Sequence, residues 1–216
     1  MKYHADTLPP AIPLWIGGHA FLTMARDFAE VRDAGNGEVI RRVPLCGDAE
    51  IDAAIEAASA VAPTWAARTL PERQALLQAL ASELARYADH FAGLLRQECG
   101  CEAAAAAGEV AAAISTLAAG EIGDAGMLAL AVGRETPLVT LARQLALIAR
   151  AGGTVICKPD PATASAVLAL CELTARAGWP AGVVNLVHGD HAVWQALAAR
   201  PEISRLLGAN DEETTA

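Results

Sequence analysis

The chain has 216 residues, of which 54% are hydrophobic and 4% aromatic, and its formal net charge is −9. This composition is typical of a compact, helix-rich globule and excludes an intrinsically disordered chain. The acidic balance, with no basic stripe, argues against nucleic acid as a partner. No stretch reaches the roughly 18 apolar residues of a membrane helix, and MKYHADTLPP lacks a signal-peptide core, so we expect a cytoplasmic protein with no membrane partner.

Residues 1–47 are predicted to form a small N-terminal β element. The stretches LWIGGHAFL and FAEVRDAGNGEVIRRVPL favour short strands. Between the two halves of the second stretch, Asn36-Gly37 supplies the left-handed turn that a tight hairpin needs.

Residues 48–135 are predicted to be mainly helical. Asp48 is a plausible N-cap for a first amphipathic helix that runs to Trp65, and T-L-P-E at Thr69 is a capping box that opens a second. The apolar face of this second helix continues through Leu95. A third helix is expected over Glu102–Leu117, followed by a glycine-punctuated connection with one weak strand, MLALAV.

From residue 136 to residue 207 the pattern alternates between helices and strands. The segments in order are PLVTLARQLALIAR, TVICK, ATASAVLALCELTARAG, GVVNLV and HAVWQALAAR. Strands that alternate with helices indicate parallel βαβ units covered on both faces. We therefore predict one α/β domain over residues 1–216, a Rossmann-like parallel sheet flanked by helices, with residues 208–216 as a polar tail.

Lys158 ends the predicted strand TVICK, and Pro159 follows it directly. Ligands of open parallel sheets collect outside the carboxyl ends of the strands, where a lysine ammonium can donate to hydroxyl or phosphate oxygens. Pro159 fixes the exit of the chain and removes a competing N–H group. The alternative is a solvated lysine that merely ends a strand.

The cysteines and histidines predict neither a disulfide framework nor a metal site. Cys99 and Cys101 form a lone C-x-C with no second pair at zinc-site spacing. His188 and His191 flank Asp190 in VHGDH, a minimal ligand set for metal or phosphate, but no third ligand can be named, so a solvated loop is expected. No Ser-His-Asp triad, P-loop or G-x-G-x-x-G motif is present.

Five segments in the right order resemble the N-terminal part of an aldehyde dehydrogenase. They are LWIGGH, NGEVI, DAEIDAAIEAASAVAPTWAARTLPERQALLQALASEL, GTVICKP and AGWPAGVVNLVHG, and together they cover nearly the whole chain. The resemblance implies an incomplete aldehyde dehydrogenase-like fold and a site for a nicotinamide dinucleotide, NAD or NADP.

In that family the lysine after the strand binds the adenine-side ribose, and Lys158 matches it. The predicted cofactor-binding residues are Lys158, Pro159, Asp160 and Gly189, the last where a small residue lets an adenine ring approach the backbone. The family usually has a glutamate three residues beyond the lysine, but this chain has Pro161. Asp160 would substitute with a different geometry, so a weakened cofactor site is expected.

Other departures fall where the family carries out its chemistry. R-E-T-P replaces its P-W-N turn, whose asparagine donates to the oxyanion, and the connection before it looks shorter than the family's, which crosses through an oligomerisation strand. The family's nucleophilic cysteine and general-base glutamate lie in sequence that this chain lacks, and none of Cys46, Cys157 or Cys171 sits where a thiol would be activated. We predict no catalytic residues here.

Three hypotheses follow. The chain is the cofactor half of an aldehyde-oxidising oxidoreductase, inactive alone; or a pseudoenzyme module that docks onto a full-length aldehyde dehydrogenase or forms a homo-oligomer; or a truncated remnant. Exposed apolar surface would favour the docking module. Stabilisation by NAD would favour the first hypothesis, because a ligand that binds only the native state raises its unfolding midpoint.

Overall fold

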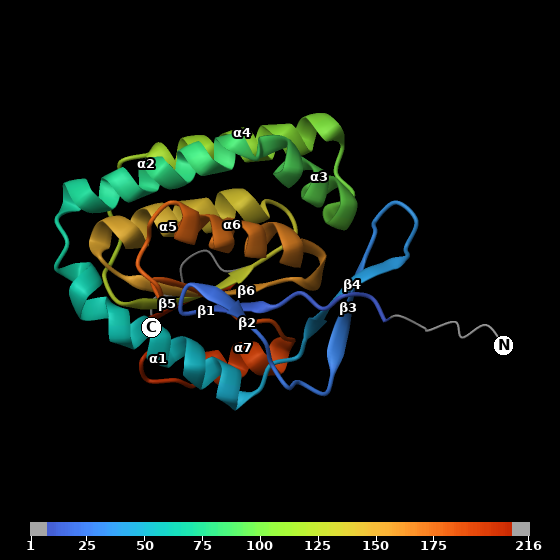
Figure 1. The fold of residues 1–216 in the computed structure, drawn as a ribbon, viewed down its shortest axis with the longest axis horizontal. Helices are drawn as coiled ribbons and strands as arrows, with labels where there is room; N and C mark the ends of the chain where they lie inside the picture. Colours follow the sequence, from blue (N-terminus) through green and yellow to red (C-terminus); the bar gives the residue numbers. More distant parts are fainter. Residues whose placement is uncertain (1–7, 209–216) are drawn as a thin grey trace.

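The computed structural model describes residues 8–208 and contains two β-sheets with helices packed around the larger one (Figure 1). The strands are β1 (Leu14–Ile16), β2 (His19–Phe21), β3 (Phe28–Arg32), β4 (Val39–Pro44), β5 (Met127–Val132), β6 (Thr154–Pro159), β7 (Val184–Leu186) and β8 (Arg205–Leu207). The helices are α1 (Asp48–Ala66), α2 (Leu70–Arg86), α3 (Ala88–Cys99), α4 (Ala103–Ala118), α5 (Pro137–Ala151), α6 (Ala164–Arg176) and α7 (His191–Ala198), with a 3₁₀ turn η1 (Pro161–Thr163).

The larger sheet has the strand order β2-β1-β7-β6-β5-β8. Its four strands β7, β6, β5 and β8 are parallel, as expected from the alternation of helices and strands. β1 joins β7 in an antiparallel pair through Trp15 and Leu186, so the sheet is mixed and not purely parallel. Of the predicted N-terminal β element only β3 and β4 form a separate hairpin, whereas β1 and β2 extend the main sheet.

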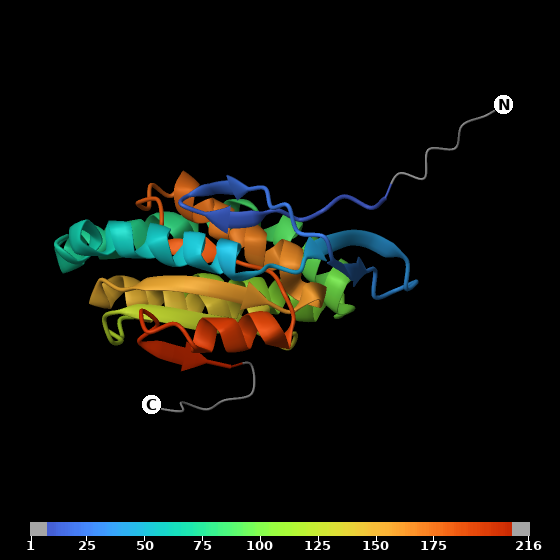
Figure 2. The same cartoon turned by 90° about the horizontal axis from the view of Figure 1, so that it is seen from below.

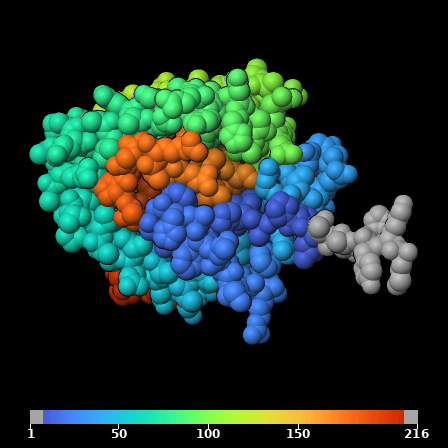
Figure 3. Space-filling model, in the orientation of Figure 1, coloured from blue at the N-terminus to red at the C-terminus, as the bar shows by residue number. Residues whose placement is uncertain are grey.

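Helices cover both faces of this sheet (Figures 1 and 2). α1 and α7 lie on one face, and α5 and α6 on the other. α2, α3 and α4 form a second helical layer outside α5 and α6, packed most extensively through α4 against α5. In Figure 3 the N-terminal segment lies across the surface between α1 in cyan and the orange segment that contains α6.

Several predicted boundaries are corrected. Gly47, and not Asp48, is the N-cap of α1, because Asp48 is already in the helix. The expected long second helix is broken at Tyr87 into α2 and α3, which lets both pack against α4. The weak strand MLALAV is the interior strand β5, which pairs with β6 on one side and β8 on the other. The residues after Ile203 form the parallel strand β8, which the local pattern did not predict.

The connection between α4 and β5, residues 119–126, is short. Gly123 N donates to Leu147 O at 3.1 Å, which holds the connection against α5. Within residues 8–208 no strand lies between α4 and β5. Among residues 8–208, no helix is long and apolar enough to cross a membrane.

Candidate functional site

The loops that follow β5, β6 and β7 meet at the carboxyl edge of the parallel strands. Open α/β sheets bind ligands at this edge, because the strand ends diverge there and leave a crevice. Two adjoining cavities lie here and share Gly133 and Asp160. Their volumes, about 350 and 520 Å³, fall at the lower end of the range of small-molecule sites, roughly 300–1,000 Å³.

Lys158 lines the smaller of the two, which we call the Lys158 cavity. Asp160, Gly189, Asp190 and His191 line it as well. Burial lowers the pKa of the Lys158 ammonium, and the carboxylates of Asp160 and Asp190 act in the opposite direction. Within residues 8–208 this ammonium forms no hydrogen bond or ion pair, so its donors are available to a ligand.

Pro159 and Asp160 continue from Lys158 but have different surroundings. Pro159 is buried opposite Val132 of β5 and is not among the described residues that line either cavity. Asp160 lies at the junction of the cavities, and its Oδ1 accepts a 2.8 Å hydrogen bond from Ala162 N, which shapes the turn η1. One carboxylate oxygen of Asp160 is therefore engaged within the chain.

Gly189 also lines the Lys158 cavity, but packing against α7 already requires a glycine there. Its φ is +154°, and a Cβ atom would lie 2.2 Å from Cγ2 of Val193. The missing side chain leaves room for the first turn of α7 as well as for the cavity.

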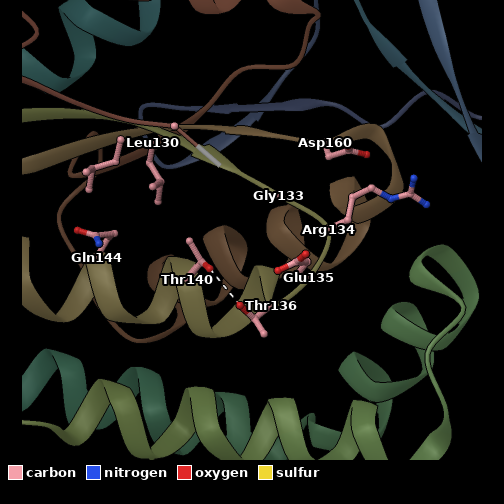
Figure 4. Close-up of a pocket in the computed structure, with 10 residues that line it drawn as sticks. Leu130, Gly133, Arg134, Glu135, Thr136, Thr140, Gln144 and Asp160 are labelled. Carbon is pink, nitrogen blue, oxygen red and sulfur yellow. Dashed lines mark hydrogen bonds between the residues drawn. The ribbon is translucent and has the colours of Figure 1, made fainter. Parts of the chain in front are cut away.

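The larger cavity, which we call the Thr140 cavity, lies between β5, β8 and the start of α5. Figure 4 shows Thr136, Thr140 and Gln144 along α5, with Leu130 of β5 across the cavity from them. The Arg134 and Glu135 side chains belong to the R-E-T-P turn and bring one charge of each sign to the lining. Thr136 and Thr140 are joined through their hydroxyls at 3.4 Å.

Helix N-termini are common anion sites, because their first amide groups lack partners within the helix. Here each of the three helices that follow β5, β6 and β7 has a carboxylate of the chain at this position. Glu109 accepts from Leu138 N of α5 at 2.8 Å, and Glu98 accepts from Ser165 N of α6 at 3.1 Å.

At the third helix, α7, Asp190 accepts a hydrogen bond from Ala192 N at 2.8 Å. Asp190 could have been predicted as an N-cap from its position before HAVWQ. The sequence around Glu98 and Glu109 does not predict their contacts, because the amide groups that they bind lie far away in the sequence. In each helix the carboxylate occupies one of the N-terminal amide groups that a phosphate group would otherwise use.

His188 corrects the expectation of a solvated VHGDH loop. It is 1% exposed, and its Nε2 lies 3.1 Å from the Pro13 carbonyl oxygen. Burial lowers its pKa to about 4, and the nearby Lys158 charge contributes in the same direction. His191, in contrast, is exposed at the start of α7. No group of three or more metal-ligating side chains occurs among residues 8–208.

Cys46, Cys99, Cys157 and Cys171 have the surroundings of inert thiols. Burial raises the pKa of both Cys46 and Cys99 to about 12. The pKa of Cys171 is also raised, first by its hydrogen bond with Cys157 and then by burial. Cys157 is fully buried in β6, one residue from Lys158. A nucleophilic thiol needs a lowered pKa and access to substrate, and Cys46, Cys99 and Cys171 lack the first of these.

Known proteins resemble this chain in sequence and in fold. The model of the aldehyde dehydrogenase family matches residues 22–123 and 125–207. The NADP(+) succinate-semialdehyde dehydrogenase of Escherichia coli (strain K12) is 31% identical over 82% of this chain and 42% of its own length. The glutarate-semialdehyde dehydrogenase of Pseudomonas putida is 34% identical over 74% of this chain and 38% of its own. The chain thus spans less than half the length of these relatives.

Solved structures agree in fold. A succinate-semialdehyde dehydrogenase from Burkholderia pseudomallei superposes with a TM-score of 0.84 at 29% identity, over 90% of this chain and 45% of its own. A structure from Sinorhizobium meliloti, described as a methylmalonate-semialdehyde dehydrogenase complexed with NAD, gives a TM-score of 0.87 at 23% identity over 93% and 46%. With the family model matched over most of its length, this chain belongs to the aldehyde dehydrogenase family.

Proposed function

We propose that the chain is a nicotinamide-dinucleotide-binding part of an aldehyde dehydrogenase, and that the Lys158 cavity receives the adenine-side ribose. The observation that carries the proposal is the Lys158 ammonium, which lines a cavity at the carboxyl edge with no partner among residues 8–208. A ribose offers adjacent hydroxyls that accept from an ammonium and donate to a carboxylate. A relative of the same fold is described as complexed with NAD, which supports this ligand class.

The residues fit the ribose end of such a ligand better than its phosphate end. Asp160 has one carboxylate oxygen in the η1 turn, which leaves the other for a ribose hydroxyl. Gly189 has no side chain that would fill the cavity. One amide group at the start of each of α5, α6 and α7 already binds a carboxylate, which leaves fewer of these groups for a pyrophosphate. We therefore propose a weakened cofactor site.

A bound nicotinamide dinucleotide supplies a hydride acceptor, but the described residues supply no activated thiol to attack an aldehyde. Cys46 and Cys99 have pKa values raised to about 12 by burial. The R-E-T-P turn brings Glu135 and Thr136 to the Thr140 cavity in place of an asparagine amide donor. We therefore propose that this chain alone does not oxidise aldehydes and that aldehyde oxidation requires residues from sequence beyond it.

Titration with NAD during thermal unfolding tests the proposal. A ligand that binds only the folded chain raises the midpoint in proportion to the logarithm of its concentration above the dissociation constant. For a dissociation constant on the order of 1 mM, we expect the full chain's midpoint to rise by a few degrees at about 10 mM NAD. An unchanged midpoint at 10-fold higher NAD than the expected dissociation constant, on the order of 1 mM, would remove the function proposed here.

A docking module is the second candidate. Leu22 and Met24, between β2 and β3, are 86% and 95% exposed. Exposed apolar side chains of this size favour a contact with another chain. Size-exclusion chromatography of the chain alone, and mixed with a full-length aldehyde dehydrogenase, distinguishes this candidate: a docking module changes elution volume in one of the two experiments, and a chain that elutes as a monomer in both is not one.

A further inference from the structure

The charges around the Lys158 cavity lead to an inference about its ligand, which rests on the proposed function. We propose that the cavity selects a ribose that carries no phosphate, so that the chain prefers NAD to NADP, and that Asp160 and Asp190 provide this selectivity.

Lys158 shares its cavity with two acidic side chains from neighbouring loops. Asp160 follows β6, Asp190 follows β7, and all three residues line one cavity. Lys158 is the only lysine or arginine in the described lining of that cavity, and His191 is the only further ionisable group there. Among its lysine, arginine, aspartate and glutamate side chains, the lining holds two acidic residues and one basic residue.

Both carboxylates are fixed at the cavity wall. Asp160 Oδ1 accepts from Ala162 N and Asp190 Oδ1 accepts from Ala192 N, each at 2.8 Å. Each contact closes a turn over two residues and caps the segment that follows, η1 in one case and α7 in the other. Neither carboxylate can swing away from an approaching anion without losing its cap.

The neighbouring charges do not reverse this balance. Arg134 and Glu135 line the Thr140 cavity together with Asp160 (Figure 4). A third hollow beside Asp160, of about 270 Å³, adds Arg32, which is paired with Glu30, and the buried Glu98. Over the three cavities, three basic side chains stand against five acidic ones.

A ribose hydroxyl and a phosphate group place different demands on such a wall. A hydroxyl both donates and accepts, so Lys158 and one carboxylate satisfy it together. A phosphate monoester carries about −1.5 to −2 charges near neutral pH and only accepts. It would gain one partner in Lys158 and approach two fixed carboxylates, an arrangement that costs about tenfold or more in affinity per close pair of like charges.

The test compares the dissociation constants of NAD and NADP for the full chain by isothermal titration calorimetry at low ionic strength. We expect NAD to bind at least about tenfold more tightly, with a ratio that shrinks as salt is added, because salt screens the repulsion. Asp160→Asn and Asp190→Asn keep the acceptor oxygen that caps each turn and remove the charge. Each should lower the NADP-to-NAD ratio of dissociation constants about threefold to tenfold.

Asp124→Asn is the matched control. Asp124 precedes β5 at the opposite edge of the sheet, 3.1 Å from Arg205, so the substitution changes the net charge equally but away from the cavity. Its ratio should equal that of the unmodified chain. NADP binding as tightly as NAD would overturn the selectivity and leave the proposed function standing. Binding of neither nucleotide would overturn both. A preference for NAD that survives both Asp substitutions would remove the role of these carboxylates.

Discussion

The carboxylate of Glu109 on α4 accepts a 2.8 Å hydrogen bond from the backbone amide of Leu138 in the first turn of α5. The outer helical layer thereby supplies the N-terminal cap for a helix of the βαβ part. Thr136, the residue at the N-cap position of α5, makes no such bond through its own side chain. The contact fixes α5 beside the Thr140 cavity and occupies an amide that a ligand phosphate would otherwise use.

Replacement of Glu109 with alanine should destabilise the fold by about 1–2 kcal/mol, the usual cost of a lost helix cap. Glu109→Gln keeps an acceptor oxygen and should recover most of this loss. Chemical denaturation of both variants measures the effect, and Glu121→Ala, an exposed position in the α4–β5 connection, is the control. Equal stability of the alanine variant and the unmodified chain would mean that this hydrogen bond does not stabilise the fold.

Buried His188 should make the fold sensitive to mild acid. Its pKa is lowered by burial to about 4 in the folded chain, against an ordinary value near 6.5 in the unfolded chain. The unfolded state therefore binds the proton first, and stability is lost as the pH falls from about 6.5 towards 4, on the order of 2 kcal/mol by pH 5. Other groups titrate in this range, so the comparison must be with a variant.

His188→Gln provides that comparison, because a side-chain amide can still donate towards the Pro13 carbonyl oxygen without titrating. The difference in unfolding free energy between the two chains, measured by urea denaturation from pH 7.5 to pH 4.5, should favour the unmodified chain most at the upper end. A difference that is flat across this range would show that His188 has the same pKa in both states.

Gly189→Ala should destabilise the start of α7 whether or not a ligand is bound. The new Cβ atom would lie 2.2 Å from Val193 Cγ2, and the φ of +154° is rare for residues with a side chain. We expect a loss of about 2–4 kcal/mol, within the range for overpacked and strained positions. The double variant with Val193→Ala should recover part of it, which a thermal melt will detect. Alanine keeps the Cβ atom of residue 193, which would still lie 2.6 Å away. No recovery would therefore place the cost in that contact or in the backbone conformation, and not in the Val193 methyl groups.

How much of this was predictable from sequence depends on the range of the interactions involved. The left-handed Gly37 in the hairpin, the cap at Thr69 and the strand that carries Lys158 are local features, and the structure contains them. The hairpin loop is longer than the tight turn predicted at Asn36-Gly37, and β6 ends one residue later than predicted, at Pro159. The joining of β1 to β7 and the caps from Glu98 and Glu109 depend on contacts between distant segments. No local pattern encodes such contacts.

The candidate site divides in the same way. Lys158 was predicted to emerge at a strand end, and it does line a cavity there with Asp160 and Gly189. The buried state of His188 was not predicted, because its partner, the Pro13 carbonyl oxygen, lies at the other end of the sequence. The expectation that Pro159 contacts a ligand gains no support from its buried position. Its role in directing the chain from β6 to η1 stays a prediction.

The most direct test of the account compares NAD binding by the unmodified chain and by Lys158→Met. Methionine keeps much of the apolar stem and removes the ammonium, whose pKa burial already lowers, so the variant should fold at least as stably. Calorimetric titration should give an NAD dissociation constant at least about tenfold higher for Lys158→Met, since a hydrogen bond from a charged donor contributes about 1.5–3 kcal/mol. Equal constants for the two chains would contradict the claim that this ammonium holds the ribose.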